Sequence, residues 1–128
     1  MPELKIKTSK IKQVVDITEE VNALIKSGAN GLVNLTVLHT TAALTTADLD
    51  EGGTDLDYLD AFEEMVPKLN YRHPHNPSHM PDHILSSMIG TSLTLPIKDG
   101  KLLLGTWQRV VLMEFDGPRD RQIMVSII

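Results

Sequence analysis

The chain has 128 residues and a mass of 14.2 kDa, which is enough for one domain of ordinary size, so we treat residues 1–128 as a single domain. It contains no cysteine, and this excludes disulfides, thiol nucleophiles, iron–sulfur clusters and thiolate zinc sites. The formal charge of −5 has the wrong sign for general binding to a phosphate backbone, so we expect no nucleic-acid partner.

The N-terminal part predicts strands followed by a helix. Its first residues lack the charged and then apolar layout of a signal peptide, and no apolar run in the chain approaches the ~20 residues that cross a bilayer. We therefore expect a cytoplasmic protein with no membrane partner. Loose alternation from Leu4 to Ile17 predicts one or two strands, paired as a hairpin. Thr18 suits the start of a helix that we expect to end near Gly28.

Residues 31–39 have the clearest strand pattern. Val33, Leu35, Val37 and His39 share one face, which places His39 at the end of an inward-facing row. Residues 40–46 continue or return the sheet, residues 47–53 form an acidic loop, and a helix begins near Asp55 and closes before proline 67.

The second half predicts a histidine-rich loop, one helix and several strands. Four of the five histidines fall between residues 73 and 83, and Pro81 suits the first turn of a helix that ends at Gly90. Strands then cover residues 91–97, residues 102–115 with an irregularity at Gly105, and the segment that ends at Ile128. Because such short turns cannot make parallel crossovers, we predict an α+β fold with a mostly antiparallel sheet and two or three helices.

The histidines are the strongest candidates for chemistry. Neutral imidazoles bind zinc and related divalent metals, and three protein ligands with an open fourth position are usual for a catalytic zinc. His39 at a strand end, His73 in a loop and His83 at a helix start could converge on one ion. The alternative is that they are loop histidines on the surface, with His39 hydrogen-bonded at the rim of the core.

Carboxylates offer a second kind of site. Asp57 and Asp82 each lie beside structured sequence, so each is a candidate general base near the histidines or an oxygen ligand for Mg²⁺. The alternative is that the acidic residues are solvated on the surface.

Arginines near the C-terminus are candidates for holding an anionic substrate. Guanidinium groups bind phosphate through two parallel hydrogen bonds, and Arg109, Arg119 and Arg121 all lie in this region. Trp107 is the only tryptophan and is either part of this site or a core or interface residue. The strand around Val111 is apolar on both faces, which favours packing against another subunit.

Several motifs in one order resemble those of the YjbQ family, also called the secondary thiamine-phosphate synthase family. The resemblance covers nearly the whole chain and is clearest from residue 39 onward. Its motifs are His39-Thr40-Thr41-Ala42-Ala43-Leu44-Thr45, Tyr71-Arg72-His73, Met80-Pro81-Asp82-His83-Ile84, Ser86-Ser87-Met88-Ile89-Gly90-Thr91-Ser92, Leu95-Pro96, Asp99-Gly100, Leu104-Gly105-Thr106-Trp107-Gln108 and Asp116-Gly117-Pro118-Arg119.

The resemblance implies a β-sandwich of two sheets that assembles as a homotrimer. It also implies that the family's histidines lie at the positions of His39, His73 and His83, where a metal such as zinc is expected. Members of the family are associated with a weak thiamine-phosphate synthase activity, which joins a pyrimidine pyrophosphate to a thiazole phosphate and releases pyrophosphate.

We therefore expect a metal-assisted enzyme that acts on a phosphorylated small molecule. Zinc is the expected metal, with Mg²⁺ as the alternative because a pyrophosphate leaving group normally needs oxygen ligands. Asp57 or Asp82 would orient a ligand histidine or accept a proton, and the substrate would contact Thr40, Trp107, Arg109 and Arg119. The alternative function is a non-catalytic trimer that binds a metal or small ligand. The roles of His75 and His79 stay open.

Overall fold

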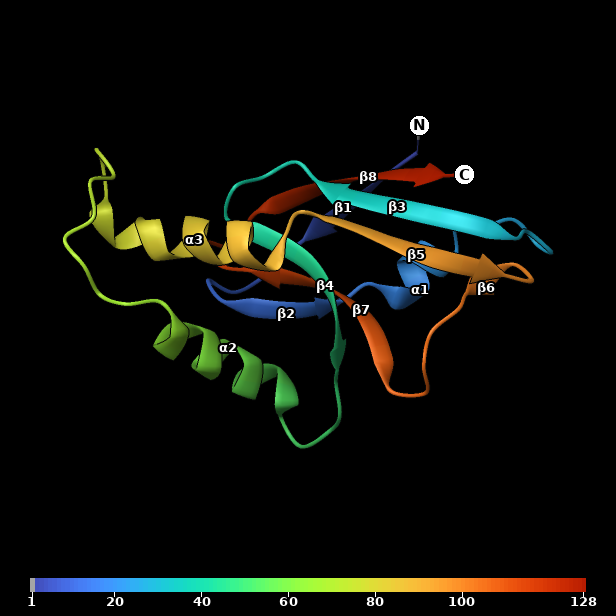
Figure 1. Ribbon diagram of the computed structural model, residues 1–128, viewed down its shortest axis with the longest axis horizontal. Coiled ribbons are helices and arrows are strands. Elements are labelled where there is room, and N and C mark those ends of the chain that lie inside the picture. The colour runs from blue at the N-terminus through green and yellow to red at the C-terminus, as the bar shows by residue number, and fades with distance from the viewer. Residues whose placement is uncertain (1) are drawn as a thin grey trace.

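The computed structural model describes residues 2–128 and arranges them as two antiparallel sheets with three α-helices (Figure 1). The larger sheet has the strand order β1-β8-β3-β5-β6, and the smaller sheet has the order β2-β7-β4. Every pair of neighbouring strands is antiparallel, which confirms the predicted α+β class. The strands are β1 (Glu3–Lys7), β2 (Gln13–Asp16), β3 (Gly31–Val37), β4 (Ala42–Asp48), β5 (Ser92–Lys98), β6 (Lys101–Leu102), β7 (Gln108–Glu114) and β8 (Asp120–Ile127).

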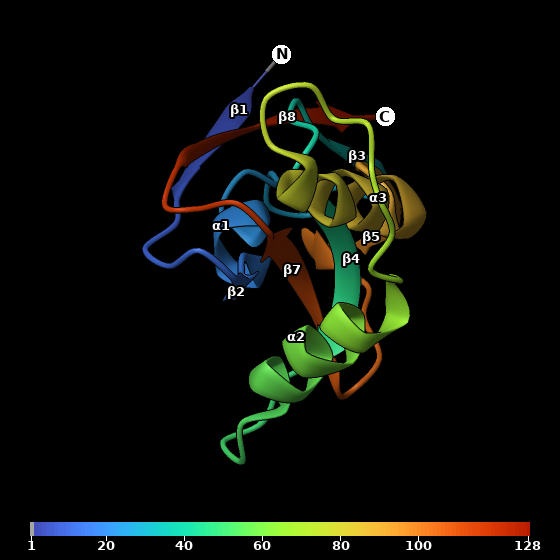
Figure 2. The ribbon, with the colours of Figure 1, turned by 90° about the vertical axis from the view of Figure 1, so that its left-hand side faces the viewer.

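The helices pack against the smaller sheet or cap its end. They are α1 (Thr18–Asn22), α2 (Thr54–Met65) and α3 (Met80–Ile89), with one 3₁₀ turn at Pro77–His79 before α3. Figure 2 shows α2 and α3 in front of β4 and β7. Pro81 lies in the first turn of α3 and Gly90 follows its last residue, as expected. Within residues 2–128, no helix has the length and apolar character needed to cross a membrane.

The apolar side chains form two cores because β7 is buried on both faces. Val110 and Leu112 point into the core between the two sheets, where they join Leu35 and Ile123 of the larger sheet. Val111, Met113 and Phe115 point the other way, into a core that also holds Val66 and Leu85 and lies under α2 and α3. Helices of the same chain therefore cover the second face of β7, so its two apolar faces do not require packing against another subunit.

Three local predictions were also wrong. Strands β1 and β2 do not form a hairpin, because β1 pairs with β8 in the larger sheet and β2 pairs with β7 in the smaller one. Helix α1 ends at Asn22 instead of near Gly28. The segment 102–115 is not one strand, since residues 103–107 form a loop between β6 and β7. For the strands, the pairing across the sheets, which local alternation does not report, decides the outcome.

Candidate functional site

A cavity of about 380 Å³ lies where the β3–β4 connection, the start of α3 and the β7–β8 turn meet. Three segments that are far apart in the sequence supply its walls, and the polar side chains among them are the candidates for function. The lining residues are Leu38, His39, Thr40, Thr41, His83, Asp116, Arg119 and Arg121. Of the residues singled out from the sequence, the cavity thus brings together His39, Thr40, His83, Arg119 and Arg121.

His39 lies just beyond β3 and is held by the backbone of β8. Its Nε2 accepts a hydrogen bond of 2.9 Å from the amide of Gln122, so in the neutral ring the proton is on Nδ1. Burial lowers the pKa of His39, and the charges of Arg121 and Arg119 lower it further against the opposing effect of Glu114. His39 is therefore a neutral hydrogen-bond donor at pH 7.

The neutral ring of His83 has the same tautomer as that of His39. Its Nδ1 lies 2.9 Å from the carbonyl oxygen of Thr40. Because a carbonyl only accepts, the Nδ1 atom carries the proton, and in the neutral ring Nε2 keeps a free lone pair. The adjacent Asp82 is buried and bonded to the Nζ atom of Lys12, which fixes the first turn of α3. His83 is thus placed by its helix and oriented by Thr40.

His73 lies beside His83 but not among the residues that line the cavity. The two rings are nearly parallel, with 15° between their planes and 5.2 Å between their centroids. The Nδ1 atom of His73 accepts a long hydrogen bond of 3.4 Å from the amide of Asn76. The ring of His79 is 6.4 Å from that of His73, and its Nδ1 lies 4.0 Å from the carboxylate of Asp116. Three imidazoles therefore gather next to the cavity.

The three predicted metal ligands do not form a ready ligand set. In the part of the chain that the structure describes, no group of three His, Cys, Asp or Glu side chains is arranged to hold a metal. His39 and His73 each use one ring nitrogen to accept a backbone amide, and the parallel rings of His73 and His83 direct their lone pairs along separate planes. A site on these three rings would require both of those hydrogen bonds to break. The zinc and Mg²⁺ sites stay predictions.

Arg119 offers hydrogen-bond donors at the edge of the cavity. Its Nε donates to the backbone oxygen of Asp116 at 2.7 Å, and its Nη2 donates to the Asp116 carboxylate at 3.0 Å. Within residues 2–128 its Nη1 group makes no hydrogen bond, and the side chain is 54% exposed. The guanidinium is therefore held by one edge and free at the other.

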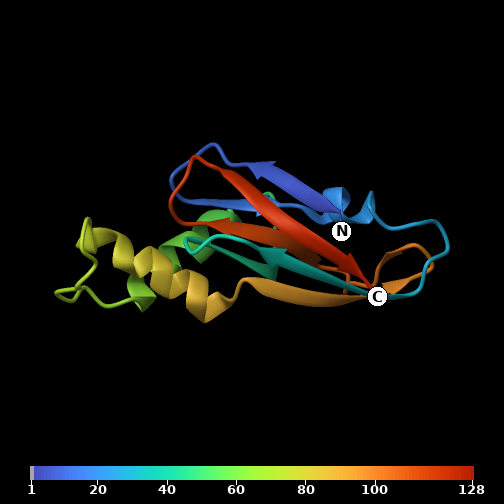
Figure 3. The same cartoon turned by 90° about the horizontal axis from the view of Figure 1, so that it is seen from above.

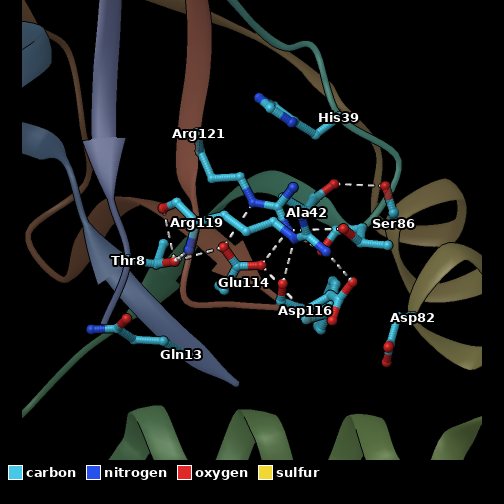
Figure 4. Close-up of polar contacts among 12 residues, drawn as sticks. Thr8, Gln13, His39, Ala42, Asp82, Ser86, Glu114, Asp116, Arg119 and Arg121 are labelled. Atoms are coloured by element: carbon cyan, nitrogen blue, oxygen red, sulfur yellow. Dashed lines mark hydrogen bonds and ion pairs between the residues drawn. The ribbon is translucent and has the colours of Figure 1, made fainter. Parts of the chain in front are cut away.

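Arg121 forms a buried ion pair with Glu114 in the wall of the cavity (Figure 4). The Nε atom of Arg121 donates to Glu114 at 2.7 Å, and Nη2 bonds the second carboxylate oxygen and the hydroxyl of Thr41. Burial acts to raise the pKa of Glu114, but hydrogen bonds from Arg121, the Asp116 amide and Thr8 outweigh it and hold that pKa below its usual value. The pair is charge-balanced, so Arg121 contributes little net attraction for an anion.

The sequence reasoning did not identify Glu114, although a signal was present. Val110 to Phe115 are all fully buried, and Glu114 is the one ionisable residue in this apolar run. A buried carboxylate requires a charged or hydrogen-bonded partner. The signal shows that a partner exists, but it does not say which of the arginines it is.

The predicted carboxylates lie outside the cavity. Asp57 is exposed on α2, and Asp82 faces a second groove, where its carboxylate pairs with Lys12. Neither residue is among those that line the cavity around His39 and His83. The structure therefore gives no geometric reason to place Asp57 or Asp82 in the chemistry of this cavity.

The predicted contacts of Arg109 and Trp107 with the substrate also fall outside the cavity. Arg109 donates to Asp16 at 2.7 Å and to Glu19 at 3.3 Å, on the surface near α1. Trp107 is 76% exposed in the loop between β6 and β7. Figure 1 places that loop at the opposite end of the small sheet from α3.

The comparisons with known proteins give one family over almost the whole chain. The model of the family described as "UPF0047 protein YjbQ-like" matches residues 2–128. The chain belongs to this family. A UPF0047 protein of Archaeoglobus fulgidus is 38% identical over 127 residues, with 98% of this chain and 99% of the relative covered. A UPF0047 protein of Methanocaldococcus jannaschii is 39% identical, with 97% and 91% covered.

Solved structures show the same fold in this family. A protein of Thermus thermophilus, described as a conserved hypothetical protein, superposes with a TM-score of 0.89 at 35% identity, and both chains are fully covered. An uncharacterised UPF0047 protein of Clostridium acetobutylicum also gives 0.89, at 38% identity and with full coverage of both chains. Three of these four relatives are named as UPF0047 proteins and the fourth as a conserved hypothetical protein, and no name states an activity. They therefore support the family and the fold and leave the function to the site.

Proposed function

We propose that the cavity binds the phosphate group of a small molecule and that the protein is an enzyme acting on that molecule. The observation that carries this proposal is that hydrogen-bond donors and one unprotonated imidazole nitrogen surround a single cavity of about 380 Å³. The donors are the free edge of Arg119, the neutral ring of His39 and the hydroxyls of Thr40 and Thr41. The free nitrogen is Nε2 of His83.

Arg119 is the residue that we assign to the phosphate. Its Nη1 group is unpaired within residues 2–128, while its other edge is fixed by Asp116, so the guanidinium is oriented before any ligand arrives. Charge-assisted hydrogen bonds to phosphate are about twice as strong as neutral ones. His39 adds a donor without adding a positive charge, since burial and Arg121 lower its pKa.

His83 is the residue that we assign to proton transfer. The carbonyl of Thr40 holds Nδ1 and leaves Nε2 able to accept a proton from an attacking group. An imidazole with one unprotonated ring nitrogen is the commonest general base in enzymes. The protein thus supplies a donor for the phosphate and a base beside it in one cavity.

Thiamine-phosphate synthase activity stays within this proposal as a candidate reaction. Its thiazole phosphate belongs to the class of phosphate esters that the cavity suits. Its pyrophosphate leaving group normally needs a metal with oxygen ligands, and residues 2–128 provide no such group. A metal, if bound at the histidines, would polarise a phosphate oxygen or activate water.

Self-association as a homotrimer is part of the same proposal. The outer face of the larger sheet supports it, because Figure 3 shows β1, β8 and β3 with no helix in front of them. That face carries Leu32, which is 44% exposed, beside a row of hydrogen-bonded polar side chains that begins at Asn34. Light scattering should then give three times the chain mass of 14.2 kDa. A monomeric mass would remove the trimer from the proposal.

The enzyme proposal is tested by screening phosphorylated small molecules for turnover by the wild type and by His83→Gln. His75→Gln is the matched control, because His75 is an exposed histidine that does not line the cavity. We expect His83→Gln to lose about 100-fold or more in kcat, within the usual contribution of a general base, and His75→Gln to keep the wild-type rate. Equal rates in all three proteins would contradict the role of His83. Phosphate binding without turnover of any compound would favour the non-catalytic alternative.

A further inference from the structure

One buried carboxylate, that of Glu114, connects three segments beneath the cavity. Glu114 is fully buried at the end of β7. It accepts hydrogen bonds from the hydroxyl of Thr8 after β1 at 2.9 Å, from the amide of Asp116 at 3.0 Å, and from Arg121 on β8. Neutralising Arg121 requires only the last of these contacts.

The other two contacts lead to Arg119. The Thr8 hydroxyl that donates to Glu114 also accepts the amide of Arg119 at 2.9 Å, and the amide of Thr8 donates to the carbonyl of Arg119 at 2.9 Å. Asp116, whose amide is held by Glu114, holds the guanidinium of Arg119 through its own backbone oxygen and carboxylate. Glu114 therefore supports both the backbone and the side chain of Arg119 (Figure 4).

The β7–β8 turn closes tightly over this carboxylate. A Cβ atom at Gly117 would lie 2.2 Å from the carbonyl oxygen of Lys10 and 2.9 Å from both Glu114 Cγ and Thr8 Oγ1. No other residue fits there without displacing the turn. The turn, Thr8 and Glu114 thus form one packed unit.

We propose that Glu114 is a positioning residue which, through the hydroxyl of Thr8 and the amide of Asp116, holds the Arg119 guanidinium at the cavity. The contacts alone carry the placement of Arg119. Only the purpose of that placement, which is to bind the phosphate, rests on the proposed function. A buried ion pair is often no more stabilising than apolar side chains of the same size, so stability alone gives a weak reason for Glu114 and Arg121. The hydrogen bonds to Thr8 and Asp116 give a specific reason for a buried carboxylate at position 114.

Thr8→Val tests the proposal without unpairing Arg121. Valine has nearly the shape of threonine but cannot accept the Arg119 amide or donate to Glu114. Thr8→Ser restores the hydroxyl. Thr18→Val is the matched control, because Thr18 is 3% exposed against 2% for Thr8, and its hydroxyl likewise accepts a backbone amide, that of Val110, at 2.8 Å. Two quantities are measured in each variant: hydrogen exchange of the Arg119 amide and Nε–H by ¹⁵N NMR, and the dissociation constant of inorganic phosphate by calorimetry.

We expect Thr8→Val to speed exchange at both Arg119 groups by about tenfold and to weaken phosphate binding by about tenfold, as for the loss of one hydrogen bond. Thr8→Ser should restore both quantities to within about twofold of the wild type, and Thr18→Val should leave both unchanged. Unchanged exchange at Arg119 in Thr8→Val would overturn the proposal, and so would wild-type phosphate affinity in that variant. If the wild type binds no phosphate while Arg119 still responds to Thr8→Val, the proposed function fails and the positioning of Arg119 stands.

Discussion

Two arginines of this protein form nearly the same contact in opposite surroundings. Arg109 and Arg121 each donate from Nε to a carboxylate oxygen at 2.7 Å. The Arg121 side chain is 1% exposed and its partner Glu114 is 0% exposed, whereas Arg109 is 35% exposed and its partner Asp16 is 34% exposed. The distance from Nε to the carboxylate oxygen is therefore equal in the two pairs. The pairs differ in burial, because Arg121 lies in the cavity wall and Arg109 lies on the surface.

The difference in burial changes what each pair can do. A surface pair competes with water and salt, so it contributes little to stability. A buried pair has lost its hydration, so each partner depends on the other, and removing one leaves an uncompensated charge in the core. The pair of Arg121 is coupled to buried surroundings through Thr8, Thr41 and Asp116. The pair of Arg109 contacts Glu19 and Thr18 near the surface.

The largest expected effect is the loss of Glu114. We expect Glu114→Ala to lower the free energy of unfolding by about 3–5 kcal/mol, because the charge of Arg121 stays buried without its partner. Urea unfolding followed by circular dichroism measures this quantity.

The double variant Glu114→Leu with Arg121→Met is the control for that effect. Removing both charges should bring the stability back to within about 2 kcal/mol of the wild type, while phosphate affinity stays reduced because Arg119 loses its support. A loss below about 1 kcal/mol in Glu114→Ala would show that burial does not separate the two arginine pairs.

Arg119→Ala should change binding far more than stability. Its contacts with Asp116 are partly exposed, so we expect less than about 1 kcal/mol of lost stability. We expect phosphate affinity to fall about 10- to 100-fold, the size of one charge-assisted interaction. Calorimetric titration with inorganic phosphate checks this prediction, and an affinity equal to that of the wild type would remove Arg119 from the site.

The pH dependence of stability also tests the comparison, because the charge of Arg121 in the buried pair acts on His39. Burial and the charge of Arg121 lower its pKa in the folded protein. The unfolded chain therefore binds a proton more readily, and the contribution of His39 to stability is present above about pH 6.5 and is lost as the pH falls below that value. Urea unfolding between about pH 7.5 and pH 5.5, on either side of that value, should show a smaller loss of stability in His39→Asn than in the wild type. The same loss in both proteins would contradict a lowered pKa.

Arg109→Ala should have the smallest effect. We expect a loss of about 0.2–1 kcal/mol in the free energy of unfolding, less at high salt, and no change in phosphate affinity. Urea unfolding at two salt concentrations and the same phosphate titration measure both quantities. Weakened phosphate binding in this variant would contradict the placement of Arg109 outside the phosphate site.

Local patterns in the sequence predicted the elements that carry strong local signals. The alternation of Val33, Leu35 and Val37 marks the buried face of β3, and Pro81 with Gly90 brackets α3. The same signals place His83 at a helix start, as the structure has it, and His39 close to a strand end, although β3 ends at Val37 and His39 follows two residues later. Two members of the cavity could thus be placed before any coordinates were known.

The errors arise where sequence distance and spatial distance disagree. Arg109 and Arg119 are ten positions apart, but β7 runs on from Arg109 to Glu114, a span of roughly 17 Å, so only Arg119 reaches the cavity. Glu114 depends on Thr8, whose position in the sequence is 106 residues earlier. No local pattern reports a pairing of that length, and this is also why the strand pairings of β1 and β2 were not predicted.

The most direct test of the account is a titration of the wild type with inorganic phosphate, followed through the imidazole ¹⁵N signals of the five histidines. We predict saturable shifts in the signals of His39 and His83, which line the cavity, and none in that of the exposed His75. Equal shifts in His75, or no shift in His39 and His83 at millimolar phosphate, would contradict the assignment of the cavity as a phosphate site.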